Sequence, residues 1–212
     1  MNIINTNIKQ SAIKNIFNYE AKFCLGIVNL KQLPMNDIPQ IAFWGRSNVG
    51  KSSLLNSIFN KKKLVRVSNT PGRTREINFF SLCEKIYFVD LPGYGYAKFD
   101  KNKKEKWTDL SVSFIDESIN LKKIYLLIDS KVGLLKIDKE AIEFLDHIGK
   151  DYQIILTKID RISDKLLNNT ICEIKNFLFE KKILYNKISL LCSSKRKIGL
   201  DIIKEDILKL ID

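Results

Sequence analysis

Residues 45–52 read GRSNVGKS and form a complete phosphate-binding loop of the pattern G-x-x-x-x-G-K-[ST]. In this pattern consecutive backbone N–H groups converge on phosphate oxygens, the lysine reaches the β- and γ-phosphates, and the final hydroxyl ligates Mg²⁺. The apolar run 41–44 and the amphipathic stretch from Ser53 supply the expected strand and helix, which disfavours the alternative of a ligand-free Gly-rich turn. We assign phosphate contacts to Gly45, Arg46, Ser47, Asn48, Val49, Gly50, Lys51 and Ser52, with Lys51 as a catalytic group and Ser52 as a metal ligand.

A second candidate site is the sequence DLPG at residues 90–93, directly after the apolar run 86–89. It matches D-x-x-G, in which an acid at a strand end reaches Mg²⁺ and the glycine N–H meets a γ-phosphate. A lone D-x-x-G is a common turn, but here it follows a second strand downstream of the phosphate loop. The predicted contacts are Asp90 (to the metal through water), Leu91, Pro92 and Gly93, with Gly93 also counted as catalytic.

A third motif, TKID at residues 157–160, decides which base the site prefers. It resembles the [NT]-K-x-D motif of GTP-binding proteins, in which the carboxylate accepts hydrogen bonds from guanine N1 and N2. Adenine lacks those donors, so the carboxylate would lose its partners there. We therefore predict GTP and GDP as ligands, bound through Thr157, Lys158, Ile159 and Asp160.

Two weaker segments complete the predicted site. Cys192, Ser193 and Ser194 follow the last strand, where a backbone N–H can contact guanine O6. The polar segment 69–76 lies between the phosphate loop and DLPG and has the composition of a switch. We choose Thr74 over Thr70 as the threonine that closes over Mg²⁺, and assign this segment's contacts to Gly72, Arg73, Thr74, Arg75 and Glu76.

Short apolar runs alternate with longer helical patterns, which is typical of an α/β protein with a mostly parallel sheet and helices on both faces. Residues 79–88 form a predicted hairpin, because too few residues intervene for a crossover helix, so one strand is antiparallel. The predicted strands are 23–28, 41–44, 78–82, 85–90, 124–129, 154–157 and 188–191. The predicted helices are 51–59, 104–119, 139–148, 164–179 and 200–210.

Length and composition favour one globular domain. The chain has 212 residues, 45% of them hydrophobic, and no apolar stretch approaches the ~20 residues of a membrane span. The first twenty residues lack the apolar core of a signal peptide, so we expect a cytoplasmic protein. Residues 1–37 are expected to form an extension that packs on a domain spanning 38–212.

The net charge of +12 favours an anionic partner such as nucleic acid, although a lysine-rich composition can also reflect codon bias. Basic clusters occur at 61–63, 101–106 and 195–197. The cluster after DLPG could be repositioned by the nucleotide state, and ribosomal RNA is the anion we expect it to meet.

Taken together, GRSNVGKSSLLNSI, NTPGRTREINFF, DLPGYGYAK and TKID closely resemble the EngB (YihA/YsxC) family of bacterial GTP-binding proteins, within the TrmE-Era-EngA-EngB-Septin-like class. The resemblance implies a three-layer P-loop NTPase fold of the Ras-like type. It also implies a monomer that binds large ribosomal subunit precursors, assists their maturation and is needed for division and septation. By motif match, the family's Mg²⁺ ligands fall on Ser52 and Thr74.

Hydrolysis by this chain is expected to be slow. Ras-like enzymes orient the attacking water with a glutamine directly after D-x-x-G, and here that residue is Tyr94. A ribosomal partner or a bound monovalent cation could supply the missing function. Asn48 motivates the second, because related GTPases use an asparagine at this place to hold K⁺; a turn-forming asparagine without an ion is the alternative. A small-molecule kinase and a non-hydrolysing RNA-binding module are the rival functions, and neither explains TKID and DLPG together.

Overall fold

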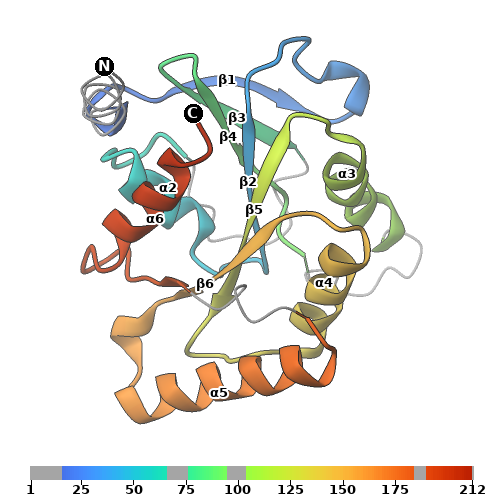
Figure 1. The fold of residues 1–212 in the computed structure, drawn as a ribbon. Coiled ribbons are helices and arrows are strands. Elements are labelled where there is room, and N and C mark those ends of the chain that lie inside the picture. Colours follow the sequence, from blue (N-terminus) through green and yellow to red (C-terminus); the bar gives the residue numbers. More distant parts are fainter. Residues whose placement is uncertain (1–15, 66–75, 95–103, 184–189, 212) are drawn as a thin grey trace, which may run out of the picture.

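The computed structural model describes residues 16–65, 76–94, 104–183 and 190–211 (Figure 1). Their core is a seven-stranded sheet in the order β1-β3-β4-β2-β5-β6-β7. β3 runs antiparallel to both neighbours, whereas the other pairs are parallel, which confirms the predicted fold class. The strands are β1 (Lys22–Ile27), β2 (Gln40–Gly45), β3 (Ile77–Leu82), β4 (Ile86–Asp90), β5 (Leu121–Asp129), β6 (Tyr152–Thr157) and β7 (Leu190–Leu191).

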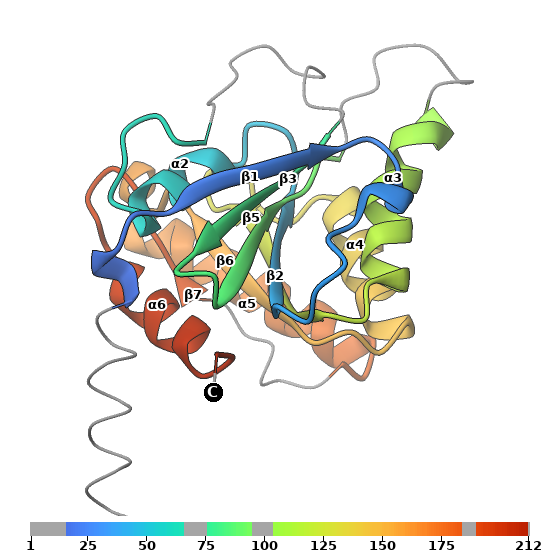
Figure 2. The same cartoon turned by 90° about the horizontal axis from the view of Figure 1, so that it is seen from above.

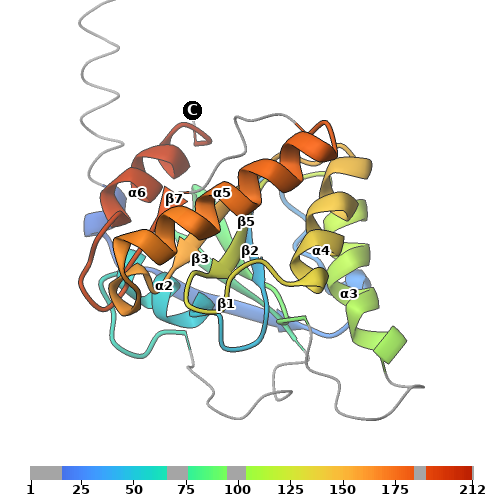
Figure 3. The ribbon, with the colours of Figure 1, turned by 90° about the horizontal axis from the view of Figure 1, so that it is seen from below.

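Helices cover both faces of this sheet, so the molecule has three layers. Buried side chains of α2 and α6 belong to one apolar cluster, and those of α3, α4 and α5 belong to the other. Figure 3 shows α2 and α6 on one side and α3 and α4 on the other. The helices are α2 (Lys51–Ile58), α3 (Lys104–Glu117), α4 (Lys136–His147), α5 (Asp164–Glu180) and α6 (Leu200–Leu208).

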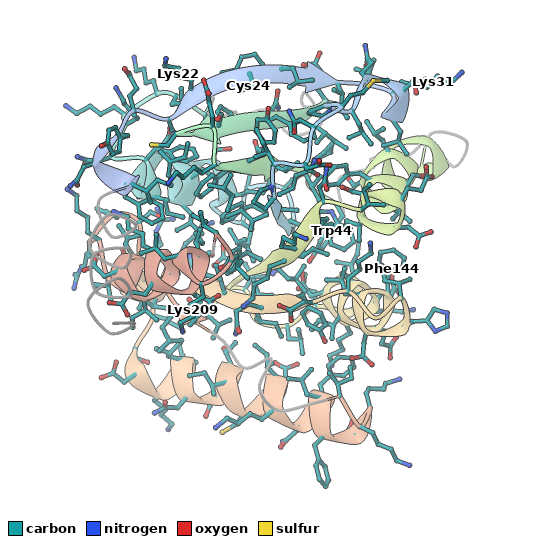
Figure 4. All side chains as sticks on the ribbon, turned by 45° about the horizontal axis from the view of Figure 1, so that its top comes forward. Lys22, Cys24, Lys31, Trp44, Phe144 and Lys209 are labelled. Carbon is teal, nitrogen blue, oxygen red and sulfur yellow. The ribbon has the colours of Figure 1, made fainter. Side chains whose placement is uncertain are left out.

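The alternation of side chains along β2 explains why this strand lies at the centre. Ile41 and Phe43 point into the α2/α6 cluster, whereas Ala42 and Trp44 point into the opposite one. All six residues of β2 are buried, as expected for a strand covered on both faces. The Trp44 and Phe144 rings lie 6.2 Å apart between their centroids, joining β2 to α4 (Figure 4).

The predicted N-terminal extension contributes a strand to the same sheet. β1 pairs antiparallel with β3 (Figure 2). In this pairing Lys22 lies opposite Ser81 and Ile27 lies opposite Ile77. Two short 3-10 helices, Ile16–Asn18 and Leu30–Gln32, flank β1. The domain boundary at residue 38 stays a prediction.

Most predicted elements differ from the observed ones by one or two residues, but β5 and α4 each begin three residues before the predicted start. α4 begins at Lys136, whereas the prediction placed its start at 139. The cause is Asp138, whose Oδ2 accepts a hydrogen bond from the Leu135 N–H at 2.9 Å and so caps the first turn. Residues 188 and 189 of the last predicted strand lie outside the described residues.

Candidate functional site

Four of the predicted segments meet at one edge of the sheet. β2, β4, β6 and β7 run parallel to one another, so their carboxyl ends lead into loops on the same side. Those loops carry residues 45–52, 90–93, 157–160 and 192–194. Ligands of open α/β sheets bind at this edge.

The phosphate loop joins β2 directly to α2. Gly50 adopts φ 107°, a backbone conformation that favours glycine, and stands immediately before the first residue of α2. Gly45 lies against β5, because a Cβ atom there would be 2.7 Å from the Leu127 carbonyl oxygen. The N-terminus of α2, with its unpaired N–H groups, therefore opens onto the loop, as an anion site requires.

The Lys51 ammonium forms an ion pair with the Asp90 carboxylate. The two side chains are 11% and 5% exposed, so they form a nearly buried pair. Lys51 begins α2 and Asp90 ends β4, so the pair joins the two motifs assigned to phosphate and metal. Ser52, the predicted Mg²⁺ ligand, is half-buried and adjacent to Lys51.

Backbone hydrogen bonds hold residues 91–94 against β2 and the phosphate loop. The Leu91 N–H donates to the Phe43 carbonyl at 3.1 Å, and the Ser47 N–H donates to the Tyr94 carbonyl at 3.2 Å. Gly93 passes so close that a Cβ atom would lie 2.9 Å from the Ser47 nitrogen. A side chain at position 93 would therefore force the two segments apart.

TKID contacts the phosphate loop from the other side. Thr157 Oγ1 donates to the Val49 carbonyl at 2.7 Å. Lys158 adopts φ 58° and its ammonium donates to the Asn48 carbonyl at 2.6 Å and to Asp129 Oδ2 at 2.7 Å. These hydrogen bonds fix the position of TKID relative to the phosphate loop.

The segment from Cys192 closes the base end of the site. The Ser193 hydroxyl donates to Asp160 Oδ1 at 2.6 Å, and this hydrogen bond holds the pKa of the Asp160 carboxyl below its ordinary value. The Ile159 N–H donates to the Cys192 carbonyl at 3.4 Å. Burial raises the pKa of the fully buried Cys192 thiol to about 11, so the thiol is neutral at physiological pH.

A groove of about 400 Å³ lies between α2, TKID and the segment from Cys192, and its volume is within the size range of small-molecule sites. Its wall carries residues of the predicted nucleotide segments and several cations. The lining residues are Gly50, Ser53, Asn56, Ser57, Lys61, Lys62, Thr157, Lys158, Asp160, Arg161, Ser194 and Lys195.

Comparison with known proteins agrees with this geometry. Residues 40–158 match the family model described as "50S ribosome-binding GTPase". A probable GTP-binding protein EngB of Rickettsia bellii is 45% identical over 205 residues, covering 97% of this chain and 95% of the relative. One from Caulobacter vibrioides is 41% identical over 199 residues, covering 94% and 86%. The chain belongs to the EngB family. It is therefore a guanine-nucleotide-binding protein with a GTPase domain.

Solved structures agree on the fold of this EngB-family chain. The crystal structure of a probable GTP-binding protein EngB superposes with a TM-score of 0.65 at 28% identity, covering 81% of this chain and 98% of the other. A structure of Era has a TM-score of 0.65 at 23% identity, covering 82% and 57%, and supports the fold alone. Among the described residues, no helix is long and apolar enough to cross a membrane.

The predicted contacts of this EngB-family chain at residues 72–76 fall mostly outside the described residues. Gly72, Arg73, Thr74 and Arg75 lie outside the described residues. Glu76 is described and exposed; a Cβ atom on Gly26 of β1 would be 2.9 Å from its Oε2, so its side chain lies beside the edge strand.

Two buried acids that the sequence analysis missed also belong to this neighbourhood. Asp129 ends β5 and accepts a hydrogen bond from the Lys158 ammonium. The sequence does carry a signal for this residue, because Asp129 follows the apolar run 124–128 as Asp90 follows the apolar run 86–89. Asp138 lies inside α4 and contacts Arg46 and Tyr94. It follows no motif and is 92 residues from Arg46, so no local signal points to it.

Proposed function

We propose that this chain is a slow, Mg²⁺-dependent GTPase switch that acts in the cytoplasm, as a monomer, on precursors of the large ribosomal subunit. In this role it would be needed for normal division and septation. The observation that carries the proposal is the meeting of the phosphate loop, DLPG and TKID at one edge of the sheet, in a chain of a family described as ribosome-binding.

The Lys51–Asp90 pair supports the proposed metal and phosphate roles. When nucleotide binds, Lys51 turns to the β- and γ-phosphates, and Asp90 acts on the metal through water. With triphosphate and Mg²⁺ bound, Lys51 and Asp90 would each keep a counter-charge, so neither charge would be left buried alone. Ser52 and Thr74 supply hydroxyl oxygens, which are hard ligands of the kind Mg²⁺ prefers. When bound, Mg²⁺ neutralises charge on the phosphates during transfer.

Asp160 carries the preference for guanine. Its pKa is lowered, so it is ionised and can accept from both guanine donors. Ser193 orients the carboxylate from the opposite segment. A backbone N–H of residues 192–194 is assigned to guanine O6.

Slow intrinsic hydrolysis follows from the position of Tyr94. Its hydroxyl donates to Asp138 Oδ1 at 2.9 Å, and its ring packs edge-to-face on Trp44 at 4.9 Å. The side chain is 8% exposed and points into the α3/α4 side of the sheet, so it does not orient an attacking water. We assign that function to a ribosomal partner or to K⁺ held beside Asn48.

Ribosomal RNA is the proposed anionic partner. The exposed residues Lys61, Lys62, Arg161 and Lys195 line the groove, and the exposed Lys63, Arg196 and Lys197 follow two of them in the chain. Lysines on a rim can neutralise phosphates without blocking the nucleotide, and each neutralised phosphate makes binding more sensitive to salt.

Co-sedimentation with ribosomal subunits tests the proposal. We expect binding to large-subunit precursors with a non-hydrolysable GTP analogue, weaker binding with GDP, and a steep loss between about 50 and 200 mM salt. Replacing Lys195, Arg196 and Lys197 by Gln should reduce binding. The control replaces three exposed lysines of α4 and α5 (Lys136, Lys165 and Lys175) by Gln and removes the same charge. Binding that ignores both nucleotide and salt contradicts the proposal.

A further inference from the structure

Asp138 is a fully buried carboxylate that two segments of the site share. Its Oδ1 accepts from Arg46 Nε at 3.0 Å and from the Tyr94 hydroxyl at 2.9 Å. Its Oδ2 accepts from the Leu135 N–H at 2.9 Å. Burial raises the pKa of this carboxyl, and its three hydrogen-bond donors oppose that shift.

The two side chains that reach Asp138 come from the two segments assigned to the γ-phosphate. Arg46 is the second residue of the phosphate loop, and Tyr94 directly follows Gly93 of DLPG. Their backbones are also paired: Ser47 N–H donates to the Tyr94 carbonyl at 3.2 Å, and Tyr94 N–H donates to the Gly45 carbonyl at 3.3 Å. Asp138 therefore ties the side chains of segments whose main chains are already in contact.

Arg46 is held through two nitrogens of its guanidinium. Besides Asp138, its Nη2 donates to the Gly133 carbonyl at 3.1 Å, in the loop that leads into α4. Its side chain is 14% exposed. Arg46 thus serves as an anchor of the phosphate loop on α4, with its guanidinium directed to Asp138 and Gly133.

The contacts of the buried Asp138 carboxylate hold Arg46 and Tyr94 in fixed positions. Moving either segment away would leave the carboxylate, or the guanidinium, buried with fewer partners, and such a loss is costly in an apolar interior. The Trp44 and Tyr94 rings pack edge-to-face with 4.9 Å between their centroids, and this contact limits Tyr94 to its present position. The spacing between the phosphate loop and Gly93 is thereby coupled to α4.

We propose that Asp138 is a positioning residue that sets the spacing between the phosphate loop and Gly93, so that both segments bind the γ-phosphate together. The inference rests on the proposed function in taking residues 45–52 and Gly93 as γ-phosphate contacts. GDP has no γ-phosphate to bridge the two segments. The Asp138 contacts therefore raise the affinity for GTP and leave the affinity for GDP nearly constant.

Tyr94→Phe is the mildest test, because it removes one hydroxyl and keeps the ring on Trp44. Titration with fluorescent GDP and a fluorescent non-hydrolysable GTP analogue should show roughly five- to tenfold weaker analogue binding and GDP binding within about twofold of wild type. Asp138→Asn keeps the side chain's shape and should give a larger loss of the same kind. The double variant should lose no more than Asp138→Asn, because both changes act on one contact.

Tyr87→Phe is the matched control. Tyr87 lies in β4, far from the nucleotide edge, and like Tyr94 it is 8% exposed. Its hydroxyl accepts a hydrogen bond from Asn36 Nδ2 at 3.1 Å. It should lower the midpoint of thermal unfolding about as much as Tyr94→Phe while leaving both affinities unchanged. Equal losses for GDP and analogue in Tyr94→Phe, or no loss in either variant, overturn the inference. A wild-type chain that binds the nucleotides but not ribosomal subunits instead contradicts the proposed function.

Discussion

Lys158 and Asn48 are 110 residues apart, and the Lys158 ammonium donates to the Asn48 carbonyl at 2.6 Å. The same ammonium pairs with Asp129, whose side chain is 10% exposed. A residue of the guanine motif thus supports the phosphate loop, and the two ends of the site are joined through one side chain.

Replacing Lys158 by Met should weaken GDP and GTP-analogue binding alike, by at least about tenfold, because the loop loses its support and Asp129 loses its cation. Equilibrium titration with both nucleotides measures this. Lys136→Met is the control, since the Lys136 side chain is 92% exposed and its ion pair with Glu140 is long, at 3.9 Å. A selective loss of the analogue alone would show that the ammonium serves the γ-phosphate instead.

Asp160→Asn should shift the preference from guanine toward xanthine. The side-chain amide of this variant presents a hydrogen-bond donor where guanine N1 and N2 also donate. Xanthine instead offers a hydrogen-bond acceptor in place of the N2 donor. Competition between GDP and XDP measures the shift, and we expect guanine affinity to fall by at least about a hundredfold. Asp164→Asn, at the start of α5, provides a surface control. Unchanged guanine preference would remove Asp160 from the base site.

Lys51→Met should abolish triphosphate binding and also destabilise the free protein, by about 3 kcal/mol, because Asp90 remains as a buried charge. The double variant Lys51→Met with Asp90→Asn should recover much of the stability and none of the binding. Urea unfolding and nucleotide titration separate the two effects. Equal stability of the single and double variants would show that the ion pair has no energetic role.

Potassium should accelerate GTP hydrolysis if Asn48 holds a monovalent cation. Asn48 is exposed at φ 65° within the phosphate loop. Turnover is measured in K⁺ and in Na⁺ at equal ionic strength, and Asn48→Ala should remove any difference. Equal rates in the two salts would exclude the ion and leave the water-positioning function to a partner.

Cys192 should be protected and neutral, because burial raises its pKa to about 11 from an ordinary value of 9.0. Between these values the unfolded chain loses the thiol proton and the folded chain keeps it, so folding stability falls as pH rises above about 9. Cys192→Ala removes the titrating thiol without adding a buried hydroxyl, so its stability should fall less over this pH range. Alkylation at pH 8 followed by mass spectrometry should label the exposed Cys24 and Cys172 before Cys192.

The sequence by itself determined the motifs and their order along the chain. The run before GRSNVGKS predicts β2 because apolar residues fill it, and TKID predicts a guanine site because its lysine and carboxylate stand at a strand end. These are local patterns, and local chemistry is enough to recognise them. The predicted hairpin was also confirmed, because its short connection leaves no room for a crossover.

Tertiary structure decided which side chains share a buried charge. Asp138 meets Arg46 and Tyr94 only because α4 packs on the Trp44 side of β2, and nothing in the spacing of these residues predicts it. Tyr94 is a similar case. Its position after DLPG predicts that it does not orient the attacking water, and the fold shows that its hydroxyl donates to Asp138. Such contacts depend on the packing of distant elements, and a carboxylate acquires a partner only when that packing removes it from water.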